Sequence, residues 1–205
     1  MSEINNTEDR SMDVSENNAA SPAPDKKRIL KEIVDYVVMF AVAITVVLLL
    51  FSFFFRLCTV SGGSMNDTLI HGERVVISDI FYTPRRGDII VFHDTNTLNE
   101  PVIKRVIATE GETVRIHYTS TGMSVYITDK DGNETQLEED YIKYQYPTYL
   151  PGTYEIPEGK VFVMGDNRSN SKDSRDPDIG FIDERSILGK VLFRVTPISK
   201  FGKLK

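Results

Sequence analysis

Two short segments of the sequence carry residue types that could perform nucleophilic chemistry. In the first, Ser64 follows two glycines in the segment Ser61–Met65. Glycines permit a tightly bent backbone whose amide N–H groups point at one place, which suits a nucleophile with an oxyanion site beside it. Glycine and serine are equally common in flexible linkers, and taken alone the segment favours a linker.

The second segment places Lys104 and Arg105 inside the apolar run from Val102 to Ile107. Because side chains alternate along a strand, Lys104 lies on the face of Val102 and Val106, and one of the two bases must emerge among apolar residues. A lysine that snorkels at a sheet edge explains this pattern too, and it is the simpler interpretation of this segment alone.

A lysine acts as a base only when it is neutral. Its ordinary pKa is near 10.4, so at pH 7 about 1 molecule in 2,500 is neutral. Desolvation by apolar neighbours lowers the pKa of an amine. If Lys104 is the base for Ser64, we expect its pKa to fall to about 7–8.

A third segment, Gly165–Arg175, is polar from Asp166 onward and follows an apolar strand-like run. Such a stretch is usually a solvated loop. Its alternating Asp and Arg residues permit charge-assisted internal pairs, which would make the loop rigid. Rigid polar loops often belong to functional sites.

The element that precedes these segments is an apolar run of 20 uncharged residues, Tyr36–Phe55. As a helix it measures about 30 Å, the thickness of the hydrocarbon core of a bilayer. A buried core helix seldom lacks a polar stripe, and a cleaved signal peptide has a shorter apolar run and a small-residue cleavage site. We therefore predict an uncleaved transmembrane signal anchor over residues 36–57.

Basic residues predict the orientation of this anchor. Four bases precede it (Lys26, Lys27, Arg28 and Lys31) and only Arg56 follows it closely. The N-terminus is therefore expected in the cytoplasm and residues 61–205 outside the cell membrane, as in a single-pass protein. Residues 1–35 comprise this basic flank and, before it, an acidic tail. The tail has almost no large apolar side chains and is predicted to be disordered.

The remainder of the chain predicts an all-β fold of antiparallel sheets. Short runs rich in Val, Ile, Phe and Tyr are bounded by Gly, Pro, Asn or Asp, and the segment Val125–Asn133 is typical of a strand entering a tight Asp-Gly turn.

The composition excludes several classes of site. One cysteine in 205 residues rules out an internal disulfide framework and a zinc site with two thiolates, and a net charge of −6 without a basic stripe argues against nucleic acid. The three histidines, His71, His93 and His117, have no recognisable triad context.

The order of the anchor and the three segments resembles the type I signal peptidase (leader peptidase) family, as does the intervening motif Arg86–Phe92. The resemblance covers residues 36–197, and the short spacing between Ser64 and Lys104 is similar to the Gram-positive branch. It implies a serine endopeptidase that cleaves signal peptides from translocated preproteins after small residues, of Ala-x-Ala type, through an acyl-enzyme. The implied partners are preproteins and the lipid bilayer, without a metal or an organic cofactor.

The resemblance also implies a role for each site residue. Ser64 is the nucleophile and supplies a backbone amide to the oxyanion, Lys104 is the general base, and Ser171 hydrogen-bonds the lysine amine. The supporting residues are Asp166, Arg168, Asp173 and Arg175. The sequence departs from the family at Asp67, where proline is usual, and at Gly62, where some members carry a serine that completes the oxyanion hole, so the second oxyanion donor stays open.

By analogy with the family, residues 58–109 and 159–205 are expected to form the catalytic β domain and residues 110–158 a smaller β insertion. Two other functions remain compatible with the sequence. One is a non-catalytic extracellular β module tethered to the membrane, and the other is a processing peptidase dedicated to pilin-type substrates. The sequence does not identify the preproteins, the pocket residues or the oligomeric state.

Overall fold

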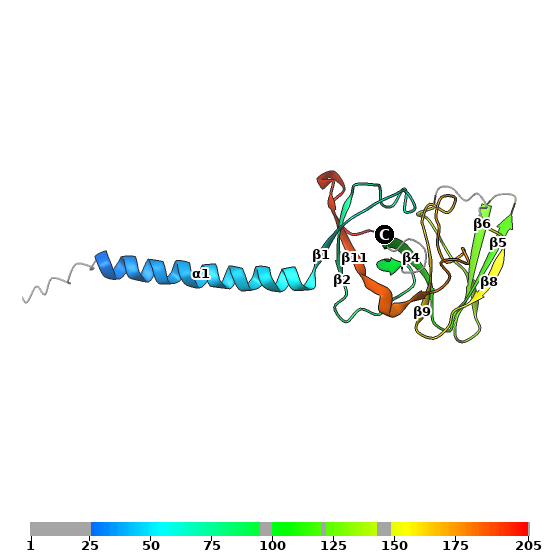
Figure 1. Cartoon of the computed structure of the whole chain (residues 1–205), viewed down its shortest axis with the longest axis horizontal. Helices are drawn as coiled ribbons and strands as arrows, with labels where there is room; N and C mark the ends of the chain where they lie inside the picture. Colours follow the sequence, from blue (N-terminus) through cyan, green and yellow to red (C-terminus); the bar gives the residue numbers. More distant parts are fainter. Residues whose placement is uncertain (1–25, 95–99, 120–121, 143–148, 205) are drawn as a thin grey trace, which may run out of the picture. The chain divides into compact units, whose positions relative to one another are not determined.

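The computed structural model describes residues 26–94, 100–119, 122–142 and 149–204. In these ranges the chain has one long helix, α1 (Lys26–Phe54), followed by β-strands that pair antiparallel in two sheets (Figure 1). The predicted all-β fold with one N-terminal apolar helix is confirmed. The predicted disordered tail at residues 1–25 lies outside the described residues.

Helix α1 is longer than the predicted span. It has 29 residues, none of its side chains is buried, and its most apolar window has a mean hydropathy of 2.9, so by length and composition it could cross a membrane. It begins ten residues before Tyr36 because the charged segment before the apolar run consists mainly of good helix formers. It ends at Phe54, before the predicted end of the anchor at residue 57, because Arg56 already begins a strand.

The larger sheet has the strand order β1-β2-β11-β3-β4-β9-β10. Its strands are rich in Val, Ile and Phe, and β4 and β9 are largely buried, as expected for strands covered on both faces. The bounds are β1 (Arg56–Thr59), β2 (Arg74–Ser78), β3 (Ile89–Asp94), β4 (Glu100–Thr109), β9 (Lys160–Met164), β10 (Ile182–Asp183) and β11 (Ile187–Thr196), with 3₁₀ turns at η1 (Glu184–Ser186) and η2 (Ile198–Lys200).

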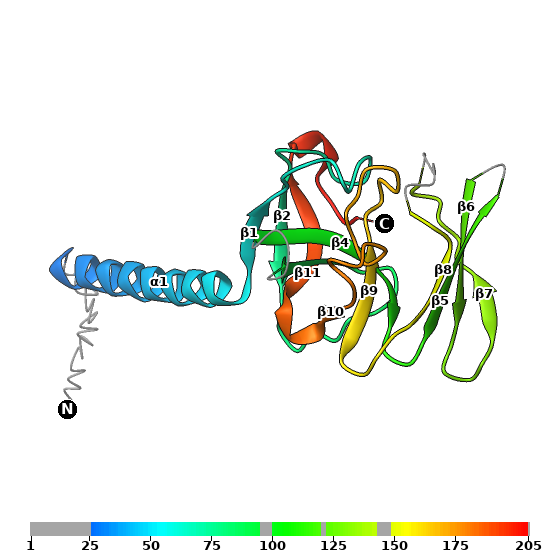
Figure 2. The same ribbon diagram turned by 45° about the vertical axis from the view of Figure 1, so that its right-hand side comes forward.

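The smaller sheet has the order β7-β6-β5-β8 and lies beside β9 (Figure 2). The Asp-Gly turn predicted after β6 is present, with the Gly132 N–H donating to the Asp129 carbonyl and Gly132 at φ +86°. All four strands fall inside the segment 110–158, whose status as a separate domain stays a prediction. They are β5 (Thr113–Thr119), β6 (Gly122–Thr128), β7 (Glu134–Gln136) and β8 (Gly152–Glu155).

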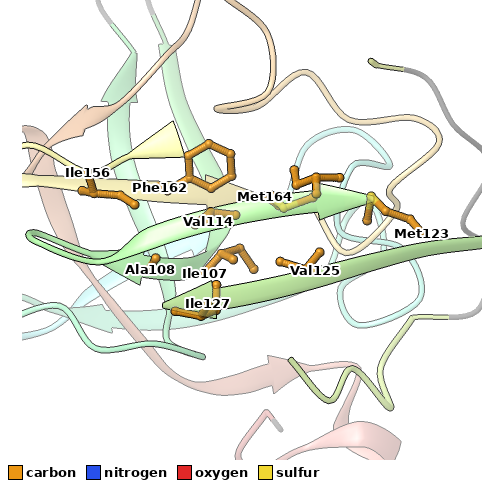
Figure 3. Packing of buried hydrophobic residues seen from close by; sticks show 10 residues of the cluster. Ile107, Ala108, Val114, Met123, Val125, Ile127, Ile156, Phe162 and Met164 are labelled. Carbon is orange, nitrogen blue, oxygen red and sulfur yellow. The ribbon is translucent and has the colours of Figure 1, made fainter. Parts of the chain in front are cut away.

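A hydrophobic cluster joins the two sheets. Figure 3 shows its side chains gathered between strands of the larger sheet and the inner face of the smaller one. Strands β4 and β9 contribute Ile107, Ala108, Phe162 and Met164, and the smaller sheet contributes residues such as Val125. The smaller sheet therefore packs against the two strands that lead into the Lys104 and Gly165 segments.

Strand β4 is an inner strand of the larger sheet. It lies between β3 and β9, and its residues reach three hydrophobic clusters, with Ile103 packed on one, Val102 and Val106 in the second, and Ile107 in the third. Because β4 is covered on both sides, Lys104 and Arg105 are each only 3% exposed. The simpler interpretation of this segment, a lysine that snorkels at a sheet edge, is therefore wrong.

The segment that contains Ser64 is a loop whose ends are tied together. The Val60 N–H donates to the Glu73 carbonyl at 2.8 Å, and the Gly72 N–H donates to the Val60 carbonyl at 2.9 Å. The loop is compact, as expected of an Ω-loop, and buries its own Met65 and Leu69. The serine thus lies on a fixed loop, and the linker interpretation does not hold.

Glu73 holds this loop through its side chain as well. Its carboxylate accepts a hydrogen bond from the Ile70 N–H at 3.2 Å and one from Arg194 at 2.8 Å, and Lys200 lies 3.6 Å away. Burial by itself would raise the pKa of Glu73, but these hydrogen bonds and the positive charges of Arg194 and Lys200 hold that pKa below its ordinary value. The ionised carboxylate therefore stabilises the folded state.

We expect Glu73→Gln to lower the free energy of unfolding at neutral pH by about 1–3 kcal/mol, because the Arg194 guanidinium loses its charged partner. The stabilisation from Glu73 is fully present above its ordinary pKa of 4.5 and is lost as the pH falls through the lower folded-state pKa. The difference between wild type and variant should therefore shrink in acid, as measured by thermal unfolding of the full chain in detergent.

Glu158→Gln is the matched control, because Glu158 is exposed and its removal should change stability by less than about 0.5 kcal/mol. Equal stability of wild type and Glu73→Gln across the whole pH range would contradict this account of the loop.

Candidate active site

The side chains of Ser64 and Lys104 meet although 40 residues separate them in the sequence. Lys104 Nζ lies 2.8 Å from Ser64 Oγ, within hydrogen-bond distance. Lys104 lies in β4 opposite Ile90 of β3, and Ser64 comes from the loop between β1 and β2. The structure therefore brings together the two residues that the sequence singled out for chemistry.

The pair opens into a pocket of about 240 Å³. Three stretches of chain form its walls: the end of β1 with the Ser64 loop, the first half of β4, and the polar segment after β9. Its lining residues are Thr59, Val60, Ser61, Gly62, Gly63, Ser64, Met65, Glu100, Pro101, Val102, Ile103, Lys104, Asn170 and Lys172. A pocket that joins a hydroxyl, an amine and apolar walls fits a reaction on a bound ligand.

The loop backbone sets the position of Ser64. The Leu69 N–H donates to the Met65 carbonyl at 2.9 Å, and both side chains are buried, so a turn anchored in the core begins directly after Ser64. Asn167 fixes the loop from the other side, since its N–H donates to the Ser64 carbonyl at 2.9 Å and its Nδ2 to the Gly63 carbonyl at 3.0 Å. Sequence reasoning noted Asn167 only as one polar residue in a loop.

Backbone amides near Ser64 bear on the predicted oxyanion site. In the part of the chain that the structure describes, the Ser64 N–H donates to no protein acceptor, so it could bind a developing negative charge. The Gly62 N–H is engaged, because it donates to Nδ1 of His71 at 3.2 Å. His71, which sequence reasoning set aside, therefore helps to shape the loop that carries Ser64.

Three buried arginines lie in β4 and in the polar segment after β9, and each contacts a buried carboxylate. Arg105 holds Asp166 through two hydrogen bonds, of 2.9 and 2.7 Å. Arg175 holds Asp173 in the same way, at 2.8 and 2.9 Å. The third arginine, Arg168, pairs with Glu139, which follows β7 of the smaller sheet.

The prediction of pairs inside the polar loop is thus right only for Asp173 and Arg175. Asp166 pairs with the strand residue Arg105, and Arg168 reaches a different part of the chain. The physical reason is that the loop turns within Gly165–Asn170, so neighbours in the sequence point to different sides. Alternation of charge along a loop does not reveal which side chains meet.

Arg105 and Arg175 stay charged. Burial would lower the pKa of Arg105, but the hydrogen bonds and the charge of Asp166 raise it above its ordinary value. Burial would lower the pKa of Arg175 too, but the hydrogen bonds and the charge of Asp173 raise that pKa above its ordinary value. Because an unpaired buried charge is costly, each pair constrains the loop to the arrangement in which both partners are satisfied.

Ser171 does not make the predicted hydrogen bond. Its Oγ is buried and has no hydrogen-bond partner among the residues that the structure describes. Gly165 packs directly against it, since a Cβ on Gly165 would lie 2.2 Å from Ser171 Oγ. The serine is thus held against the glycine, and the predicted bond to the Lys104 amine is absent from the structure.

Further residues of the site carry no clear signal in the sequence. The Gly87 carbonyl accepts a hydrogen bond from Arg105 at 2.9 Å, which gives a reason for the Arg86–Phe92 motif. The Tyr141 ring lies 3.9 Å from the Arg105 guanidinium, as in a cation–π contact. Within the described ranges, no cluster of three or more His, Cys, Asp or Glu side chains could hold a metal ion.

Comparison with known proteins gives consistent matches. Residues 33–196 match the family model described as signal peptidase, peptidase S26. The chain is 34% identical over 187 residues to signal peptidase IB of Staphylococcus aureus, covering 83% of this chain and 93% of the relative. It is 37% identical over 194 residues to a probable signal peptidase I-1 of Synechocystis sp., covering 90% of this chain and 91% of that protein.

One solved structure is also similar in sequence. The crystal structure of a signal peptidase I from Enterococcus faecalis V583 is 31% identical and matches 54% of this chain and 97% of that chain, with a TM-score of 0.42. The resemblance to the type I signal peptidase family is confirmed by the family model and the curated relatives. Assignment to the Gram-positive branch stays a prediction.

Gly165 should tolerate no side chain. A Cβ there would lie 2.2 Å from Ser171 Oγ and 2.5 Å from the Ser64 carbonyl oxygen, which is backbone and cannot move alone. We expect Gly165→Ala to lower the free energy of unfolding by about 1–3 kcal/mol through overpacking, as measured by thermal unfolding in detergent.

Gly63→Ala is the matched control, because its Cβ would meet only the Asn66 side chain, at 3.2 Å. Its effect should stay below about 1 kcal/mol. Equal losses of stability in the two variants would show that the packing of Gly165 on Ser64 and Ser171 is not the cause.

Proposed function

The chain belongs to the signal peptidase family of S26 peptidases, and we propose that it is a membrane-anchored serine endopeptidase that removes N-terminal signal peptides from translocated preproteins. Ser64 is the nucleophile and Lys104 its general base. The observation that carries this proposal is the 2.8 Å contact between Ser64 Oγ and Lys104 Nζ at the edge of a pocket.

Burial gives Lys104 the property that a base needs. The residue is 3% exposed and lies in a strand whose neighbours Val102 and Val106 are buried. A low-dielectric environment disfavours the ammonium form, so the neutral amine becomes accessible near neutral pH. A bound peptide that excludes water from the pocket would increase this effect.

The reaction begins when neutral Lys104 accepts the Ser64 proton as Oγ attacks the scissile carbonyl carbon. The Ser64 N–H stabilises the oxyanion of the tetrahedral intermediate. The protonated amine then gives its proton to the leaving nitrogen as the C–N bond breaks, which leaves an acyl-enzyme. Lys104 next removes a proton from water as the water oxygen attacks the ester carbon, and it returns that proton to Ser64 Oγ as the ester C–O bond breaks, which releases the peptide acid.

The remaining predicted residues act as support. Asp166 is bonded to Arg105, the residue after Lys104, and Asp173 accepts a hydrogen bond from the Gly165 N–H at 2.9 Å. Through these contacts the segment Gly165–Asn167 is held against the Ser64 carbonyl. None of these groups touches the reacting atoms in this mechanism.

The shape of the pocket supports an extended peptide substrate with small side chains near the cleaved bond. Its walls include Thr59–Ser61, at the end of β1, and Pro101–Ile103 of β4. An extended peptide could pair with such backbone as an added strand. The side chains of Val60 and Ile103 would leave shallow apolar space, which fits cleavage after Ala-x-Ala sequences.

The anchor and its flanking charges support a location in the cell membrane. Helix α1 is long and apolar enough to span a bilayer, and its basic residues gather before the apolar run. The positive-inside rule then gives a cytoplasmic N-terminus and an extracellular β region. A preprotein emerging from the membrane would present its cleavage site on the same side as Ser64.

Preprotein processing by the full chain in detergent tests the proposed roles. We expect Ser64→Ala and Lys104→Ala each to lower the rate at least about 1,000-fold while circular dichroism stays unchanged, because each variant removes one half of the reacting pair. Ser124→Ala in β6 and Lys130→Ala in the turn after it are controls of the same residue types and should keep full activity.

Processing that survives in Ser64→Ala would refute the serine mechanism. A stable complex of the wild type with preprotein, without cleavage, would favour the non-catalytic β module. Cleavage of pilin-type precursors alone would favour the dedicated processing enzyme.

The pH dependence tests the state of the base. Only the neutral amine accepts the proton, so kcat/KM should be low in acid and rise with pH through one ionisation of the free enzyme. Because Lys104 is buried, we expect that ionisation well below the ordinary lysine pKa of about 10.4. A rise centred near 10.4 would contradict a desolvated base, and Lys130→Ala should leave the profile unchanged.

A further inference from the structure

A short segment after β7 turns two side chains inward toward the arginines of the site. Side chains alternate along residues Leu137–Tyr141, with Leu137 packed against the cluster that joins the sheets and the next residue exposed. Glu139 points inward and its side chain is 5% exposed. Tyr141 is the next inward residue. An acidic residue at an inward position costs desolvation, so its contacts call for an explanation.

Glu139 contacts Arg168, whose side chain is fully buried. One guanidinium nitrogen donates to a carboxylate oxygen at 2.9 Å and a second nitrogen donates to the other oxygen. The third nitrogen, Nε, donates to the Gly165 carbonyl at 3.2 Å. A residue near the smaller sheet thereby holds the guanidinium that holds the Gly165 backbone.

Tyr141 contacts Glu139, the partner of Arg168, and also contacts Arg105. Its hydroxyl donates to Glu139 at 2.9 Å, and its ring lies 3.9 Å from the guanidinium of Arg105. Arg105 directly follows Lys104 in β4 and is bonded to Asp166. The segment after β7 therefore reaches the strand of the base as well as the loop that supports the nucleophile.

The path from Gly165 to the nucleophile is short. Gly165 packs against the Ser64 carbonyl, and the Asn167 N–H donates to that same carbonyl at 2.9 Å. A shift of the Gly165–Asn167 turn would move Ser64 relative to Lys104. Misplacement of reacting groups by about 1 Å can lower a rate roughly 100-fold.

We propose that Glu139 is a positioning residue for the reaction, which fixes Arg168 and, through Tyr141, Arg105, and so sets the distance between Ser64 and Lys104. This inference rests on the proposed function. The segment after β7 then affects the rate of the reaction and not only the stability of the fold.

The test compares variants of the full chain in detergent with a peptide substrate that spans a signal-peptide cleavage site. In Glu139→Gln we expect kcat to fall by roughly 10–100-fold with KM changed less than about threefold, because the reacting pair is misplaced and the pocket walls remain. The acid limb of the kcat profile should move to higher pH, since a displaced Lys104 is better hydrated. Glu139→Asp, which keeps the charge, should recover part of the rate.

Glu134→Gln is the matched control. Glu134 forms the same kind of two-oxygen pair with Arg115 on the smaller sheet, but both side chains are more than a third exposed. Its removal should leave kcat and the pH profile unchanged. A folded Glu139→Gln enzyme with wild-type kcat and an unshifted pH profile would reduce Glu139 to a structural role and overturn the inference.

Tyr141→Phe decides the case if Glu139→Gln does not fold. It keeps the ring on Arg105 and the pair of Glu139 with Arg168, and removes only the hydroxyl. A fall of kcat by about 3–10-fold supports the inference, and an unchanged kcat overturns it. If the wild type itself does not cleave the peptide, the proposed function fails; if the wild type and both variants cleave equally, only this inference fails.

Discussion

The proposed reaction depends on keeping a lysine amine dry and within 2.8 Å of a serine hydroxyl. An exposed amine would satisfy the distance easily but would be protonated, and a buried amine far from the serine would do no chemistry. Meeting both conditions requires a strand covered on both faces and a rigid loop that approaches it. Strand β4 and the tied loop between Val60 and Glu73 meet these two requirements.

Three buried arginine–carboxylate pairs hold β4 and the polar segment after β9, and their value lies in geometry more than in stability. A buried ion pair regains little more than the desolvation that it costs, yet breaking one leaves a charge in a dry environment. The chain is therefore restricted to arrangements in which Asp166, Asp173 and Glu139 all meet their partners. Such a restriction suits a site whose reacting groups must not drift.

The smaller sheet is joined to this arrangement by two kinds of contact. Apolar side chains such as Val125 and Phe162 connect it to β4 and β9, and the segment after β7 contributes Glu139 and Tyr141 to the arginines. The apolar contacts fix the sheet without directional preference, and the polar contacts add direction. The smaller sheet is thus packed against the elements that hold Ser64 and Lys104 together.

The sequence by itself determined the apolar helix and the antiparallel β fold, because hydrophobic runs are local properties of the chain, and it singled out Ser64 and Lys104 as candidates through the order of its motifs. It also indicated that the polar segment Gly165–Arg175 is rigid. Only the tertiary structure decided the partners: that Arg168 pairs with Glu139, and that Ser171 packs on Gly165 instead of bonding the amine. The reason is that burial on both faces of β4 and the turn of the polar loop arise from strands far apart in the chain, and no local pattern encodes which distant groups they bring together.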